Sequence, residues 1–128
     1  RKYDAPKAYA DSKIANLYFT YELARKLNKS SIRVLAAHPG WTSTNLQTNC
    51  LLFRLPNPFF AQMPETVSLP TLRAPTDPVA HIADYFGPSG WQEVRGYPKK
   101  VASNKRSNDK EIAENLWRAS EKLTGIKY

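Results

Sequence analysis

The sequence predicts an α/β fold, and more narrowly the C-terminal part of a doubly wound parallel sheet that these 128 residues leave incomplete. A helical pattern over residues 8–28 is followed at once by an apolar strand pattern over 32–37, as in the second half of a strand–helix–strand crossover. A second amphipathic helix follows over 109–124. The third observation is that the sequence offers few strands. A buried parallel strand needs neighbours on both sides, so the sheet is expected to be incomplete in this chain.

The first helix is expected over residues 8–28, where apolar side chains recur at helical spacing. Pro6 lies just before it, at a position typical of a helix start, and Asn28 begins a polar stretch that is expected to end the helix. The strand over 32–37 is short and mostly apolar, and Pro39-Gly40 ends it.

Residues 39–64 form a long irregular stretch with four prolines and an apolar middle. A loop of this length inside a compact domain is usually functional or disordered, so we interpret it as a substrate and cofactor loop. Residues 65–73 favour a short helix that Pro70 breaks or bends, and residues 84–86 are a brief strand candidate.

The last helix is expected over residues 109–124, with Asn108 or Asp109 as its N-cap and Gly125 as its stop. Its expected apolar side comprises Ile112, Leu116, Trp117 and Leu123.

Composition suits a globular protein, with 41% hydrophobic residues and no apolar run of the roughly 18 residues that span a membrane. The single Cys50 excludes an internal disulfide and fits a reducing compartment, so we expect a cytoplasmic location. The alternative is association with a membrane through a missing segment. The only methionine is Met63, and we therefore expect a missing N-terminal half of the same domain, which is the first predicted partner.

The formal net charge is +8, and part of it gathers in one stretch. Such a cluster can attract a phosphate backbone, but only Tyr97 lies nearby for base stacking. We favour a solvated loop, or a charge balanced by an acidic half, and expect no nucleic-acid partner. The cluster comprises Lys99, Lys100, Lys105 and Arg106.

Tyr9 and Lys13 lie four residues apart at the head of the first helix, which places them on one face. An ammonium beside a phenol favours the phenolate, and such a phenol can donate and accept a proton near neutral pH. Tyr3 and Lys7 have the same spacing, but Pro6 between them marks a helix start, so they are not expected to share a face.

The segment from Tyr9 to Ala24 resembles the active-site helix of the short-chain dehydrogenase/reductase family. His38-Pro39-Gly40-Trp41-Thr42-Ser43-Thr44 resembles the Pro-Gly-x-x-x-Thr segment beside the nicotinamide in that family. Residues 85–90 and the last helix look like the retinol-dehydrogenase-like branch. The resemblance covers essentially the whole chain, as the C-terminal half of a single Rossmann-like oxidoreductase domain.

This resemblance implies roles for particular residues. Tyr9 would be the general acid in carbonyl reduction and the base in alcohol oxidation, and Lys13 would hydrogen-bond the ribose of NAD or NADP. The family's glycine-rich turn and catalytic serine would both precede Arg1. The implied cofactor contacts are Tyr9, Lys13, Pro39, Gly40, Trp41, Thr42 and Thr44.

The turn after the strand is expected to let the backbone approach a cofactor closely, at the end of a sheet where open α/β folds bind ligands. By resemblance Thr42 contacts the carboxamide through its backbone and Thr44 through its hydroxyl. The alternative for Thr44 is a cap on a short following helix, and Trp41 either lines the pocket or packs. His38 is interpreted as the end of the strand. The two histidines and the single Cys50 are scattered along the sequence and form no ligand set, so no metal site is expected.

The leading hypothesis is therefore an NAD(P)-dependent oxidoreductase, inactive as this piece alone, with Tyr9 as general acid and base. Leucines and phenylalanines over residues 51–60 predict an apolar alcohol or carbonyl substrate, although they could instead cover the sheet or contact a second copy in a homo-oligomer. The alternative is a catalytically silent family member that acts as a binding or interaction protein.

Overall fold

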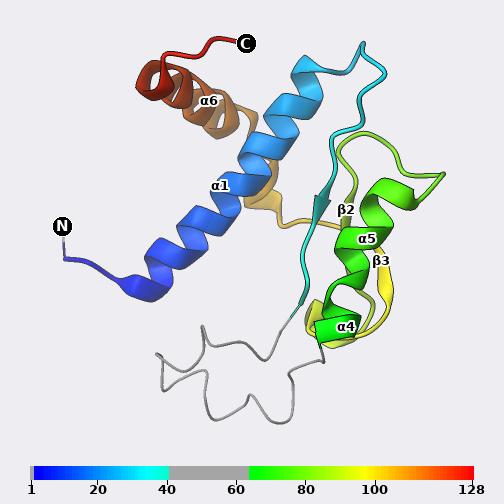
Figure 1. The fold of residues 1–128 in the computed structure, drawn as a ribbon. Helices are drawn as coiled ribbons and strands as arrows, with labels where there is room; N and C mark the ends of the chain where they lie inside the picture. The colour runs from blue at the N-terminus through cyan, green and yellow to red at the C-terminus, as the bar shows by residue number, and fades with distance from the viewer. Residues whose placement is uncertain (1, 41–63) are drawn as a thin grey trace. The chain divides into compact units, whose positions relative to one another are not determined.

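The structure, a computed structural model, describes residues 2–40 and 64–128 (Figure 1). It divides the chain into two compact units, Arg1–Val34 with Ser103–Tyr128, and Leu35–Ala102. The first unit is helical and the second contains a sheet with helices, so the predicted α/β class is confirmed. The interpretation of residues 1–128 as part of a single Rossmann-like domain stays a prediction.

In the first unit, helix α1 spans Ala5–Lys26. It begins earlier than predicted because proline in a first turn loses no hydrogen bond, and because the Asp4 side chain caps the helix by accepting from the Lys7 N–H at 3.1 Å. The helix ends before the predicted Asn28, where the Leu27 N–H makes the last bond to the helix.

The 3₁₀ helix η3 (Lys105–Asn108) leads into helix α6 (Lys110–Thr124). Asp109 is the N-cap and accepts from the Ile112 N–H at 3.1 Å, and Gly125 ends the helix in the left-handed conformation, with φ of 74°. The predicted apolar side is partly wrong, because Ile112 and Leu123 are exposed, at 42% and 87%, while Ala113 and Trp117 are buried.

Trp117 organises the packing of this unit. Its ring stacks on Phe19 of α1 with centroids 5.3 Å apart, and the Lys26 ammonium lies 4.9 Å from the ring centroid. Its indole N–H donates to Glu121 Oε1 at 2.9 Å, and the Tyr128 backbone N–H donates to the same oxygen at 3.1 Å. These two bonds, that of Tyr128 first, hold the pKa of Glu121 below its usual value.

The stability of the protein is therefore expected to depend on pH through Glu121. A carboxylate whose pKa is lowered by folding stabilises the folded state above its unfolded pKa, and this contribution disappears as the pH falls through the folded pKa. We expect Glu121→Gln to reduce the loss of unfolding free energy on acidification, measured by urea unfolding from neutral to acid pH. Glu114→Gln, which removes an exposed partner of Arg118 on the same helix, is the matched control, and an unchanged slope in Glu121→Gln would contradict the assignment.

The second unit contains a three-stranded sheet in the order β1-β2-β3. Strand β1 (Ala36–Ala37) runs parallel to β2 (Tyr85–Pro88), and β2 runs antiparallel to β3 (Pro98–Val101). The strand predicted over 32–37 is shorter in the structure. Within the described residues it pairs only with β2, whose register begins opposite Ala36.

Helix α4 (Pro64–Val67) and helix α5 (Leu69–Thr76) precede β2. The predicted interruption lies at Ser68, and Pro70 occupies the first turn of α5, where proline is tolerated. Helix α5 packs against all three strands. The core of this unit comprises Ala74, Ala80 and Phe86, with Leu35 and Ala37 packed against it.

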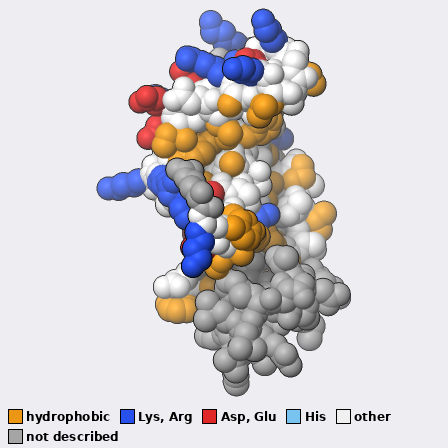
Figure 2. All heavy atoms as spheres, turned by 90° about the vertical axis from the view of Figure 1, so that its left-hand side faces the viewer, with side chains coloured by type: hydrophobic (Ala, Val, Ile, Leu, Met, Phe, Trp, Pro, Cys, Tyr) orange, Lys and Arg blue, Asp and Glu red, His pale blue; other side chains and the backbone are white. Residues whose placement is uncertain are grey.

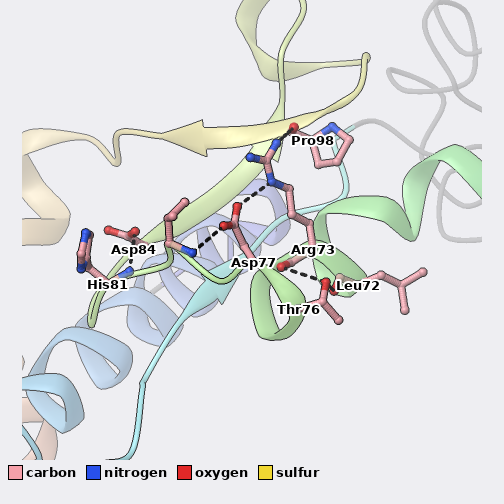
Figure 3. Close-up of polar contacts among 8 residues, drawn as sticks. Leu72, Arg73, Thr76, Asp77, His81, Asp84 and Pro98 are labelled. Atoms are coloured by element: carbon pink, nitrogen blue, oxygen red, sulfur yellow. Dashed lines mark hydrogen bonds and ion pairs between the residues drawn. The ribbon is translucent and has the colours of Figure 1, made fainter.

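Arg73 connects α5 to β3 (Figure 3). Its guanidinium donates to the buried Asp77 carboxylate at 2.9 Å and to the carbonyl oxygen of Pro98, and it lies 5.8 Å from the Phe86 ring centroid.

Asp84 is also buried. It accepts from the His81 N–H at 2.9 Å (Figure 3), and it pairs with Lys100 of β3 at 2.6 Å. Part of the predicted basic loop is thus an edge strand, held by the Lys100–Asp84 ion pair and by the hydrogen bond from Arg73 to Pro98.

Candidate functional site

Helix α1 brings Tyr9 and Lys13 together. The Lys13 ammonium lies 5.4 Å from the centroid of the Tyr9 ring, within the range of a cation–π contact. Both side chains are exposed, with 53% of Tyr9 accessible. A cation is therefore held against an accessible phenol. Tyr3, in contrast, precedes the N-cap Asp4 and lies outside the helix.

The Lys13 ammonium has no carboxylate partner among the described residues. The nearby Asp11 pairs instead with Lys7, at 2.5 Å. An ammonium carries three N–H donors and needs no acceptor group of its own, so Lys13 can donate to the hydroxyls of a bound ligand.

Strand β1 is followed by His38, Pro39 and Gly40, at the carboxyl end of a parallel strand. Gly40 has φ of +77°, and a Cβ added there would lie 2.5 Å from the Val94 carbonyl oxygen. Only glycine fits this position, both for its conformation and for its close contact with a neighbouring backbone. The turn therefore has the backbone freedom and the position in the sheet that a ligand-binding turn of an open α/β fold requires.

The His38 imidazole bridges this turn and a distant loop. Its Nε2 lies 2.9 Å from Glu93 Oε2, and its Nδ1 accepts from the Gly40 N–H at 3.3 Å. Because Nδ1 is an acceptor, Nε2 carries the hydrogen and donates to the carboxylate. Gly87 makes room for the ring, since a Cβ there would lie 2.1 Å from His38 Nε2.

Glu93 belongs to a tight loop after β2 that includes the 3₁₀ helix η2 (Trp91–Glu93). Gln92 and Glu93 have φ of 48° and 57°, and the left-handed conformation costs a residue other than glycine about 1–2 kcal/mol. The loop is closed by backbone bonds from Ser89 to Tyr97 and from Gly90 to Arg95, both 2.8 Å. Backbone strain of this kind tends to occur at functional sites.

Sequence reasoning missed the contact between His38 and Glu93. The two residues are 55 positions apart, and no motif or periodicity joins them. Two successive left-handed residues in the sequence Trp-Gln-Glu-Val carry no glycine or asparagine signal either. Trp41, Thr42 and Thr44, three of the predicted cofactor contacts, lie outside the described residues, as does most of the loop over 39–64.

The two described halves of the predicted site belong to different units, with Tyr9 and Lys13 in the first and Pro39 and Gly40 in the second. No cluster of three or more potential metal ligands occurs in the described part of the chain. Across residues 2–40 and 64–128, no helix is long and apolar enough to cross a membrane.

The chain is similar to known proteins over its whole length. The chain is 33% identical to mouse retinol dehydrogenase 12 over 135 aligned positions, covering 100% of this chain and 39% of that protein. It is 30% identical to mouse retinol dehydrogenase 13, covering 98% and 38%. A crystal structure of an uncharacterized protein from Mycobacterium paratuberculosis matches with a TM-score of 0.75 at 34% identity, over 100% of this chain and 42% of that one. No protein-family model matches.

These relatives are retinol dehydrogenases of the short-chain dehydrogenase/reductase family, and this chain is similar to them over essentially its whole length. The similarity is to the retinol-dehydrogenase-like branch of that family and corresponds to the C-terminal part of these relatives. It spans about two fifths of the length of the curated relatives that it matches.

Proposed function

We propose that this chain supplies the proton-transfer part of an NAD(P)-dependent oxidoreductase that interconverts an alcohol and a carbonyl compound. The observation that carries the proposal is the Lys13 ammonium held against the accessible Tyr9 phenol. Similarity to retinol dehydrogenases supports the same reaction class.

In this proposal Tyr9 acts directly on the substrate oxygen. During reduction its hydroxyl donates a hydrogen bond, and then the proton, to the carbonyl oxygen; during oxidation the phenolate accepts the alcohol proton. Lys13 stabilises the phenolate by its charge and donates hydrogen bonds to the ribose hydroxyls. The nicotinamide cofactor, when bound, supplies or accepts the hydride.

The residues of the turn fit such a cofactor. Gly40 has the left-handed conformation, and Pro39 is exposed at the carboxyl end of β1. We assign backbone contacts with the nicotinamide to Pro39 and Gly40, and further contacts to Trp41, Thr42 and Thr44. NAD and NADP are equally compatible with these residues.

The complete active site also needs sequence that this chain does not contain. The relatives are more than twice as long, and several large apolar side chains of the described residues are exposed, as the orange areas of Figure 2 illustrate. We propose that a preceding segment of the same domain completes the sheet and covers part of this surface. The apolar substrate, a second copy as partner and a cytoplasmic location stay predictions.

Replacing Lys13 by Ala tests the proposed function in the protein expressed at its full length. We expect the cofactor KM to rise about 10- to 100-fold, the loss expected for hydrogen bonds from a charged donor. We also expect the pH–activity profile to shift to higher pH, because the phenol loses its neighbouring cation. Initial rates of nicotinamide oxidation and reduction across pH measure both effects.

The control for this experiment is Lys7→Ala on the same helix, which removes an exposed cation that pairs with Asp11. It is expected to leave both quantities unchanged. A Lys13→Ala protein with wild-type cofactor KM and an unshifted profile would refute the role of the pair, whereas an unshifted profile with a raised KM would limit Lys13 to ribose binding.

A further inference from the structure

We infer that Glu93 is a positioning residue, which acts through His38 to hold the Pro39–Gly40 turn in the conformation that receives the nicotinamide. The inference rests on the proposed function, because the ligand of this turn is the proposed cofactor. All of the residues that carry it lie in one compact unit, Leu35–Ala102.

A continuous chain of hydrogen bonds runs from Glu93 to the turn. The carboxylate Oε2 lies 2.9 Å from His38 Nε2, and the opposite ring nitrogen lies 3.3 Å from the Gly40 backbone N. Because the carboxylate only accepts, it requires the hydrogen on Nε2 and leaves Nδ1 free to accept from Gly40. Glu93 therefore selects the one neutral tautomer that can hold the turn.

The His38 imidazole has little freedom to move. One side of the ring lies against Gly87, where a Cβ would be 2.1 Å from Nε2, and the Tyr85 ring centroid is 5.1 Å away. The ring can thus transmit the position of the carboxylate to the Gly40 N–H. A longer, mobile side chain would transmit this position less well, because ordering it costs conformational entropy.

The loop that carries Glu93 contacts the Pro39–Gly40 turn a second time, through its backbone. A Cβ on Gly40 would lie 2.5 Å from the Val94 oxygen and 3.1 Å from the Glu93 oxygen. The loop that carries Glu93 therefore contacts the turn both directly and through the imidazole. The left-handed backbone at Gln92 and Glu93 brings the carboxylate to this position.

The test compares Glu93→Ala, Glu93→Gln and Glu114→Ala in the protein expressed at its full length. Glu93→Ala keeps the backbone preference of an L-residue and removes only the carboxylate, so we expect the cofactor KM to rise about tenfold, the loss of one charged hydrogen bond, with kcat nearly unchanged. Glu93→Gln retains an acceptor and is expected to stay within a few-fold of wild type. Glu114→Ala, which removes an exposed carboxylate paired with Arg118 on α6, is the control and should leave KM unchanged.

A double-mutant cycle with His38→Asn asks whether Glu93 acts through the imidazole. The Asn side-chain oxygen can still accept from the Gly40 N–H, as in an Asx turn, but cannot reach Glu93. Glu93→Ala should therefore have no further effect on cofactor KM in the His38→Asn background. Nitrogen chemical shifts of the His38 ring give an independent readout, because wild type should show a hydrogen on Nε2 only.

The outcomes separate the two proposals. If wild type binds the cofactor and Glu93→Ala binds it equally well, the positioning role is overturned while the role of Tyr9 stands. A hydrogen on Nδ1 of His38 would overturn it as well. If wild-type protein binds neither NAD nor NADP, the proposed function fails and the cofactor role of the turn fails with it. An additive loss in the double mutant would overturn the path through His38.

Discussion

Replacing Tyr9 by Phe is expected to lower kcat by about 10²- to 10⁴-fold, the usual contribution of a positioned general acid or base. Phenylalanine keeps the ring, and with it the face over which the Lys13 ammonium lies, but it has no proton to donate. Cofactor affinity should therefore stay close to that of wild type. Steady-state rates in both directions measure the first quantity, and fluorescence titration with the reduced cofactor measures the second.

Tyr3→Phe is a closely matched control for this variant. Tyr3 and Lys7 have the same spacing in sequence, but Tyr3 precedes the N-cap of α1 and is 81% exposed, so no change in kcat is expected. Wild-type turnover in Tyr9→Phe would refute the proton-transfer role. Wild-type protein that binds cofactor without turning over any alcohol or carbonyl substrate would favour the catalytically silent alternative instead.

The part of the site that could be predicted from sequence is the part that depends on local geometry. A helix places residues four apart on one face whatever surrounds it, so the contact between Tyr9 and Lys13 follows from their spacing. Both ends of α6 were equally predictable, because Asp109 caps the start of the helix and Gly125 adopts the left-handed conformation that ends it.

The remainder depends on contacts between distant segments. Strand β3 was not predicted because its lysines and proline are typical of an exposed edge, where side chains show no alternation of apolar and polar types. The strand over 32–37 was predicted too long because the length of a ladder is set by its partner. The pairing of His38 with Glu93 depends on the backbone of a loop whose left-handed residues give no local signal.

Truncating Trp117 to Ala is expected to have the largest effect on stability, about 3–5 kcal/mol in the free energy of unfolding. The side chain is buried, and its ring packs on Phe19 of α1 and against the ring of Tyr128. Truncation would leave a cavity between α1 and α6 and would remove one of the two donors to the Glu121 carboxylate. Chemical unfolding followed by circular dichroism measures the change.

Two further variants separate the packing of Trp117 from its hydrogen bond. Trp117→Phe keeps an aromatic ring against Phe19 but loses the N–H donor, so a smaller loss, about 1 kcal/mol for the missing hydrogen bond plus a packing loss, is expected. Trp91→Ala removes a tryptophan that is 69% exposed, and a surface substitution of this kind should change stability by no more than about 0.5 kcal/mol. Equal losses for Trp117→Ala and Trp91→Ala would contradict the packing of α6 on α1, and with it the scaffold that holds the helix carrying Tyr9 and Lys13.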